Sequence, residues 1–189
     1  MEPVSEFIQE SNKLKIIKLL ESTHRKNIEA LLSYVTETDY FIAPASSKLE
    51  HHAAYKGGLA FHSLNVYELF NEKCERYSID LPVEERIISA LCHDLCKINF
   101  YEKNILKDGT QSKDKPYNVC EQVPLGHGEV SLYRAGKMID LTPQEEMLIR
   151  WHMGQFDGNW ENNSRYVREK CPTIALFQNS DIEASRYLE

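Results

Sequence analysis

The sequence feature that most constrains the fold is a histidine–aspartate pair, His93 and Asp94, late in an apolar, helix-patterned stretch. The i, i+3, i+4, i+7 spacing of one helix face is occupied by Ile87, Ala90, Leu91 and Asp94. Asp94 is therefore expected on the buried face, where an unpaired carboxylate costs several kcal/mol or takes up a proton. The pattern predicts that Asp94 meets a cation there, with His93 beside it as a second ligand.

Length, composition and charge set the class of protein. A chain of 189 residues with 42% hydrophobic and 27% charged residues is ordinary for one soluble domain with a substantial core. Its net charge of -7 argues against broad, charge-driven binding to nucleic acid or to anionic lipid. The five cysteines are odd in number and form no CxxC pair, which fits a reducing compartment. No apolar run approaches the roughly 20 residues of a membrane-spanning helix, so we expect a cytoplasmic protein that does not bind membranes.

Hydrophobic periodicity predicts a mostly helical chain. Helices are expected over residues 5–22, 25–36, 59–77, 82–94, 126–139, 142–152 and 172–189. The start at residue 142 is marked by Thr142, Pro143 and Glu145, which form a capping box with proline at the first position. Residues 99–126 are the least helical stretch, and their turn signal predicts a small β-hairpin around residues 100–119. Residues 154–163 are polar and rich in turn formers.

Ligand-type side chains fall on or next to the inward faces of these helices. The set consists of His62, His93, Asp94, His152, Asp181 and, at the start of a further helix, His127. One inward histidine is more often a core residue than a ligand, but two inward carboxylates and four histidines would each need a separate partner. A shared site for one or two divalent metal ions explains all of them at once. Mixed imidazole and carboxylate ligation suits Mn, Fe, Zn, Ni or Co, while Mg is the alternative that prefers an oxygen-rich shell.

Two cysteines lie one helical turn apart within the same stretch. Cys92 and Cys96 are either further ligands or, the better interpretation, buried core residues. The absence of Cys₄ or Cys₂His₂ spacing argues against a closed structural zinc site.

The order of these residues resembles a known family. His62, then His93 with Asp94, then the distant Asp181 resemble the HD-domain superfamily of metal-dependent phosphohydrolases, as do the strings over residues 57–63 and 93–97. The resemblance implies an all-α fold, an HD-type helical bundle, as a single domain over residues 1–189. Residues 41–189 would form the HD core and residues 1–40 an N-terminal helical extension. It also implies that these four residues bind metal, with Asp94 as the bridging carboxylate if there are two ions.

Two further histidines resemble those that bind a second metal in some HD branches. His127 and His152 are similar to them in order and placement, and His127 is alternatively a phosphate donor and acid. The cyclic-di-nucleotide phosphodiesterase branch carries an adjacent histidine pair and a Gly-Tyr-Pro motif, whereas His152 stands alone here and Gly-Tyr-Pro is absent. The stretch from Pro44 to His62 also resembles the HD part of certain bacterial 3′–5′ exoribonucleases.

Three basic side chains are candidates for binding substrate. Asp94 and Lys97 are the expected catalytic residues. Lys97 lies one helical turn beyond His93, so its side chain can reach the same site and bind phosphate there. An ordinary helix-end lysine is an equally good interpretation. Arg134 is a candidate phosphate clamp, with a surface arginine as the alternative. Either His51 or His52 is expected to line the pocket, and we choose His52 as the candidate.

Three hypotheses for function follow. The first is a metal-dependent phosphohydrolase that cleaves a phosphate ester of a nucleotide or a similar small phosphorylated substrate, which the acidic charge favours. The second is a 3′–5′ nuclease or phosphodiesterase on single-stranded nucleic acid. The third is a non-catalytic metal-binding sensor or partner-binding module. Aromatic residues that could wall a pocket for a base, or simply fill the core, are Tyr101, Tyr117, Trp151, Phe156 and Trp160.

Overall fold

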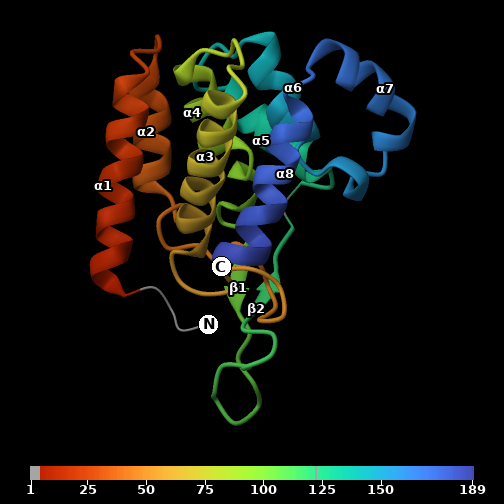
Figure 1. Ribbon diagram of the computed structural model, residues 1–189. Coiled ribbons are helices and arrows are strands. Elements are labelled where there is room, and N and C mark those ends of the chain that lie inside the picture. The colour runs from red at the N-terminus through yellow and green to blue at the C-terminus, as the bar shows by residue number, and fades with distance from the viewer. Residues whose placement is uncertain (1–4, 122) are drawn as a thin grey trace.

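The computed structural model describes residues 5–121 and 123–189, which form a bundle of helices with one two-stranded hairpin (Figure 1). The first four helices are α1 (Glu6–Ser22), α2 (Ile28–Glu37), α3 (Gly58–Arg76) and α4 (Val83–Cys92). After the hairpin come α5 (His127–Gly136), α6 (Pro143–Trp151), α7 (Trp160–Lys170) and α8 (Ile174–Glu183). Short 3₁₀ helices follow α4 and α6, namely η1 (Leu95–Lys97) and η2 (Gly154–Phe156). The π-helical turn η3 (Ala184–Leu188) extends α8.

A β-hairpin lies between α4 and α5, in the stretch that the sequence predicts to be non-helical. Strand β1 (Tyr101–Lys103) pairs antiparallel with β2 (Tyr117–Val119), with Glu102 opposite Asn118. The predicted class, mostly helical with a small hairpin around residues 100–119, is confirmed. Within the described ranges, every helix is too short or too polar to span a lipid bilayer.

Helix α3 is the element around which the others pack. It contacts α1, α4 and α8, as Figure 1 shows. One group of core side chains lies where α1 and α2 meet α3 and α4, and it includes Ile16, Leu31, Leu59 and Ile88. A second group surrounds Phe70 and Phe177, whose rings meet edge to face at 4.9 Å. The Phe177 ring also lies 5.9 Å from the ring of His93, so this second group borders the predicted site.

The chain after α4 tightens and does not continue as an α-helix. Helix α4 ends at Cys92, His93 is its C-cap, and Asp94 adopts φ −110° and ψ 22° before η1 begins. The predicted helix carries both residues of the pair, whereas the structure puts Asp94 just past the helix end. The prediction that Asp94 is buried is nonetheless confirmed, because the side chain is almost fully enclosed.

Carbonyl groups at a helix C-terminus have no partner within the helix and must find one elsewhere. The Oη of Tyr40 donates to the Leu91 carbonyl at 3.1 Å. The Nη1 of Arg134 on α5 donates to the carbonyls of Leu95 and Ile98 at 2.7 and 2.9 Å. These hydrogen bonds hold the tight turn that presents Asp94.

Helix α7 begins inside residues 154–163, which the sequence pattern describes as polar and turn-rich, and the pattern does not predict this helix. Only Trp160 and Val167 of this helix are buried. Two apolar residues seven positions apart in an otherwise polar stretch show no visible helical period. Figure 1 shows α7 at the outer edge of the bundle, where a polar helix needs only a narrow apolar contact.

The C-terminal helix also departs from the prediction, because it does not stay α-helical to residue 189. An α-helical register places Leu188 on the buried stripe with Phe177 and Ala184. The wider π-helical turn leaves Leu188 45% exposed and buries Glu189 in its place. This change of one residue in register brings a carboxylate into the interior.

Helix α5 crosses very close to the end of α6 at a glycine. A Cβ atom on Gly128 would lie 2.0 Å from the carbonyl oxygen of Arg150, a distance that no side chain tolerates. The missing side chain therefore permits this approach of the two backbones. Because His127 precedes Gly128 and His152 follows α6, the contact brings these two predicted ligands toward each other.

We expect Gly128→Ala to destabilise the protein by about 1–3 kcal/mol, because the added methyl group forces α5 away from α6. Urea unfolding followed by circular dichroism measures the change. Gly136→Ala, in the same helix and with no atom within 4 Å of the new Cβ, is the matched control. It should be neutral or stabilising by up to about 1 kcal/mol. Equal stability of the two variants would contradict the close-approach argument.

Candidate metal centre

The predicted ligands from three parts of the chain converge in the core. Helix α3 contributes His62, the end of α4 contributes His93 and Asp94, and α8 contributes Asp181. The Nε2 of His62 lies 3.1 Å from Asp181 Oδ1 and 3.6 Å from Asp94 Oδ2. The Nε2 of His93 lies 3.3 Å from both His62 Nε2 and Asp94 Oδ2. The structure thus brings these four residues together, with Asp181 as the partly exposed member.

Hydrogen bonds of the histidine rings orient their lone pairs. The Nδ1 of His93 lies 2.7 Å from the carbonyl oxygen of Ala90, and the Nδ1 of His152 lies 2.8 Å from that of Ile149. A carbonyl oxygen only accepts, so each Nδ1 carries a proton, and Nε2 is the ring nitrogen that is left to offer a lone pair. Proteins commonly orient metal-ligating histidines in this way.

Asp94 joins this cluster to a second group of ligand atoms. Its Oδ1 lies 3.6 Å from His152 Nε2 and 3.8 Å from Cys96 Sγ. Ligand atoms of Asp94, Cys96 and His127 also lie within 4.8 Å of one another. Within the described ranges, His152 Nε2 and His127 Nδ1 are buried without a hydrogen-bond partner, an uncommon and costly state. Asp94 directs one oxygen at each group, and each group offers ligand atoms that could hold a metal ion.

Negative charge accumulates around His62. The three carboxylates of Asp94, Asp181 and Glu189 each lie within ion-pair distance of this ring. Lys97, whose Nζ is 2.7 Å from Asp94 Oδ2, offsets one of these charges. Burial alone would raise the pKa of Asp94, but the Lys97 ammonium and the His93 ring hold it well below its usual range. The buried carboxylate is therefore ionised, and the cluster requires further positive charge.

The protonation of His62 reflects the same requirement. Burial alone would lower the pKa of His62, but the carboxylates of Glu189 and Asp181 raise it to about 10. A second proton on this ring is therefore one way to supply the missing charge. When both rings are neutral, the Nε2 lone pairs of His62 and His93 face each other across 3.3 Å and repel. A divalent cation held by His62, His93, Asp94 and Asp181 would remove this repulsion, and the mixed nitrogen and oxygen donors fit such an ion.

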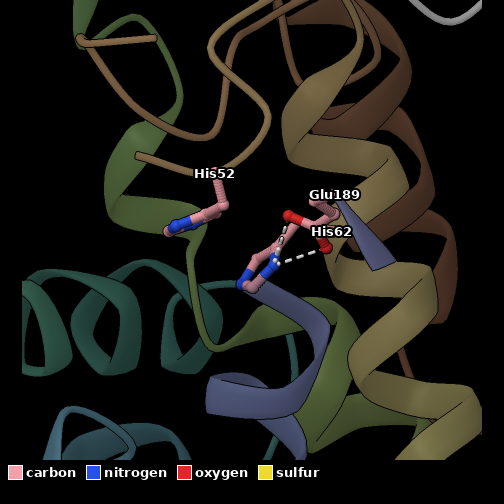
Figure 2. Close-up of side chains that lie close together, drawn as sticks. All are labelled: His52, His62 and Glu189. Carbon is pink, nitrogen blue, oxygen red and sulfur yellow. Dashed lines mark hydrogen bonds and ion pairs between the residues drawn. The ribbon is translucent and has the colours of Figure 1, made fainter. Parts of the chain in front are cut away.

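The other predicted substrate-binding residues take different positions. Lys97 is buried against Asp94, inside the cluster. His52 lies beside His62, with the ring centroids 4.7 Å apart and the ring planes tilted by 37° (Figure 2). Burial and the His62 charge lower the pKa of His52 to about 2, so its ring is neutral. Arg134 supports the turn around Asp94 through the carbonyls described above, and its role as a phosphate clamp stays a prediction.

Sequence reasoning missed Glu189. Its side-chain oxygens lie 3.0 and 3.1 Å from His62 Nδ1 (Figure 2). The residue lies eight positions after Asp181, close to the same helix face, and that spacing was the available signal. The α-helical stripe favours Leu188 at this point, because an apolar residue fits a buried face better than a carboxylate does.

Comparison with known proteins found no match: no protein-family model, curated protein or solved structure corresponds to this chain. The HD-domain resemblance therefore stays a prediction from the motifs.

We expect Asp94→Asn to abolish metal binding, because the substitution keeps the shape of the side chain but removes the charge shared by both ligand groups. Metal content of the purified protein after Zn²⁺ or Mn²⁺ loading and desalting, measured by mass spectrometry, tests this. Asp108→Asn in the exposed hairpin turn is the control and should keep the wild-type metal content. Full metal content in folded Asp94→Asn protein would refute the assignment of Asp94.

Proposed function

We propose that the protein is a metal-dependent phosphohydrolase of the HD type. Its substrate would be a phosphate ester of a nucleotide or of a similar small phosphorylated molecule. The observation that carries this proposal is the 3.3 Å approach of His62 Nε2 and His93 Nε2 beside Asp94 and Asp181. The four residues that carry these atoms follow one another along the chain in the order of the HD-family motif.

The residues around Asp94 suit attack of water on a phosphate ester. A divalent ion held there would lower the pKa of a coordinated water and neutralise phosphoryl oxygens. The Lys97 ammonium lies on the same carboxylate, so a phosphoryl oxygen that approaches Asp94 also meets Lys97. An ordinary helix-end lysine extends into solvent, whereas Lys97 is buried. Its burial at this position favours the phosphate-binding role.

His127 supports a second metal position better than an acid role. Burial lowers the pKa of His127, so the ring is neutral at pH 7 and keeps a lone pair. A neutral ring is a much weaker acid toward a leaving group than the protonated ring, but its lone pair can bind a cation. Together with Asp94 Oδ1 and His152 Nε2, His127 favours two ions over one.

An open cleft of about 250 Å³ adjoins His127 and offers room for the organic part of a small substrate. Its walls include Met153, Phe156 and Asn159, and the Phe156 ring is 68% exposed. An exposed ring in a cleft that also includes His127 can stack on a nucleobase. Phe156 is the aromatic residue, among those named from the sequence, that lines this cleft.

The charges of this cleft favour a small substrate over single-stranded nucleic acid. Its described lining residues include the carboxylates Glu129 and Asp157 and no lysine or arginine. Both carboxylates form ion pairs with Arg150, so the guanidinium group of Arg150 is already engaged. A nucleic-acid backbone needs a row of cationic contacts, and the walls of this cleft lack one.

The metal-loaded protein is expected to hydrolyse one or more members of a panel of nucleotides, cyclic nucleotides and short oligonucleotides with Mn²⁺, Co²⁺, Ni²⁺ or Mg²⁺. Lys97→Met should lower kcat/KM by about 100-fold while metal content is retained, because a donor to the phosphoryl group is lost. Release of phosphate or of a hydrolysed ester is measured. A metal-loaded wild-type protein without activity on the whole panel would support the non-catalytic hypothesis instead.

Phe156→Ala should lower kcat/KM for a nucleotide by about tenfold, because the stacking contact of the base is lost. Ribose 5-phosphate, which has the phosphate and sugar but no base, should be hydrolysed equally by the variant and the wild type. Tyr166→Ala, an exposed aromatic residue on α7 outside the cleft, is the control. Equal losses on both substrates would exclude base stacking at Phe156.

A further inference from the structure

Glu189 lies directly after the π-helical turn η3, and its carboxylate is buried against α3. Figure 2 shows its two oxygens directed at one nitrogen of His62. The distances from His62 Nδ1 are 3.0 Å to Oε1 and 3.1 Å to Oε2. Asn65, one turn further along α3, donates from Nδ2 to Oε1 at 3.2 Å and so holds the carboxylate in place.

This contact determines which nitrogen of His62 keeps its lone pair. An ionised carboxylate only accepts hydrogen bonds, so Nδ1 of His62 must carry a proton. In the neutral ring, Nε2 then presents its lone pair toward Asp181, His93 and Asp94. A ring with the opposite tautomer would direct an N–H group at the place where a cation binds.

The C-terminal segment contacts both edges of the same ring. Asp181 on α8 meets Nε2 at 3.1 Å, and Glu189 after η3 meets Nδ1 at 3.0 Å. The ring of His52 packs against this ring at a tilt of 37°, with the ring centroids 4.7 Å apart. His62 is thus held at both nitrogens, which fixes the orientation of the ring as well as its tautomer.

We propose that Glu189 is a positioning residue that orients His62 as a metal ligand. The inference rests on the proposed metal-dependent function and adds a residue that strengthens metal binding without touching the metal. Replacing a carboxylate that hydrogen-bonds to a ligating histidine typically weakens metal affinity by about 10–100-fold.

A competing interpretation is that His52, His62 and Glu189 hold a metal ion themselves, since their ligand atoms lie within 4.8 Å of one another. Such an ion would take the Nδ1 lone pair of His62 and break the hydrogen bond to Glu189. The 3.0 Å contact and the Asn65 donor on the same carboxylate instead satisfy Glu189 by hydrogen bonds. Hydrogen bonding is therefore the interpretation that the contacts favour.

Zinc affinity, measured by competition with a chromophoric chelator, tests the proposal. Glu189→Gln should weaken the tightest zinc site by about 10–100-fold, because the amide replaces the charged acceptor with a neutral group. Glu183→Gln is the matched control: this residue lies on the same segment and pairs with Lys73, and it should leave zinc affinity unchanged. Thermal unfolding of the metal-free proteins checks that both variants are folded.

Asn65→Ala provides a second variant that leaves Glu189 intact. It should weaken zinc binding less than Glu189→Gln does, and the double variant should bind no more weakly than Glu189→Gln alone, because Asn65 acts through Glu189. In ¹⁵N-histidine NMR spectra, the wild-type His62 Nδ1 proton should be hydrogen-bonded and slow to exchange. Glu189→Ala should lose this signal.

The outcomes separate this inference from the function on which it rests. Zinc affinity of folded Glu189→Gln within twofold of the wild type overturns the positioning role and leaves the phosphohydrolase proposal standing. Loss of one bound zinc ion in Glu189→Gln, with the affinity of the remaining ions unchanged, overturns it in favour of direct coordination. A wild-type protein that binds no divalent metal overturns both proposals.

Discussion

The ionised carboxylate of Asp94 in the interior is the constraint on which the rest of the structure depends. An uncompensated buried charge is costly, so the surrounding chain must supply cations and hydrogen-bond donors. Lys97 supplies one positive charge at 2.7 Å. The rings of His62, His93 and His152 surround the two carboxylate oxygens at 3.3–3.6 Å. Asp94 thereby joins two groups of ligand-type atoms, which is the physical basis for expecting a metal.

The backbone around this carboxylate departs from regular helix geometry and is held in place by specific contacts. The chain leaves α4 at Cys92 and turns sharply, and Arg134 satisfies two of the carbonyls exposed by that turn. Gly128 lets α5 approach α6 closely enough to bring His127 toward His152. Arg134, which the sequence offers as a phosphate clamp, thus has a second role in supporting the backbone around Asp94, and Gly128 is the residue that permits the close helix contact.

Much of the candidate site could be predicted from the sequence, because each ligand-type residue interrupts an apolar helix face. His62, Asp94, His152 and Asp181 stand out in this way, and the structure brings all four near one another. The same reasoning favoured Leu188 over Glu189 and a core role for Cys96 over a position beside Asp94. Cys96 looks like a core residue in an α-helical register, and only the tight turn at η1 directs its sulfur toward the carboxylate.

Local sequence patterns were enough to predict the helical class, the hairpin and the residue types available for a metal, since periodicity and turn chemistry act over a few neighbouring positions. Tertiary structure decided the rest. Helix α7 exists because Trp160 and Val167 find a surface on which to pack, which no local pattern reveals. The π-helical turn exchanges Leu188 for Glu189 in the interior, where the Glu189 carboxylate pairs with Nδ1 of His62 on α3. A hydrogen bond between residues 127 positions apart selects this register, and a local sequence pattern cannot encode it.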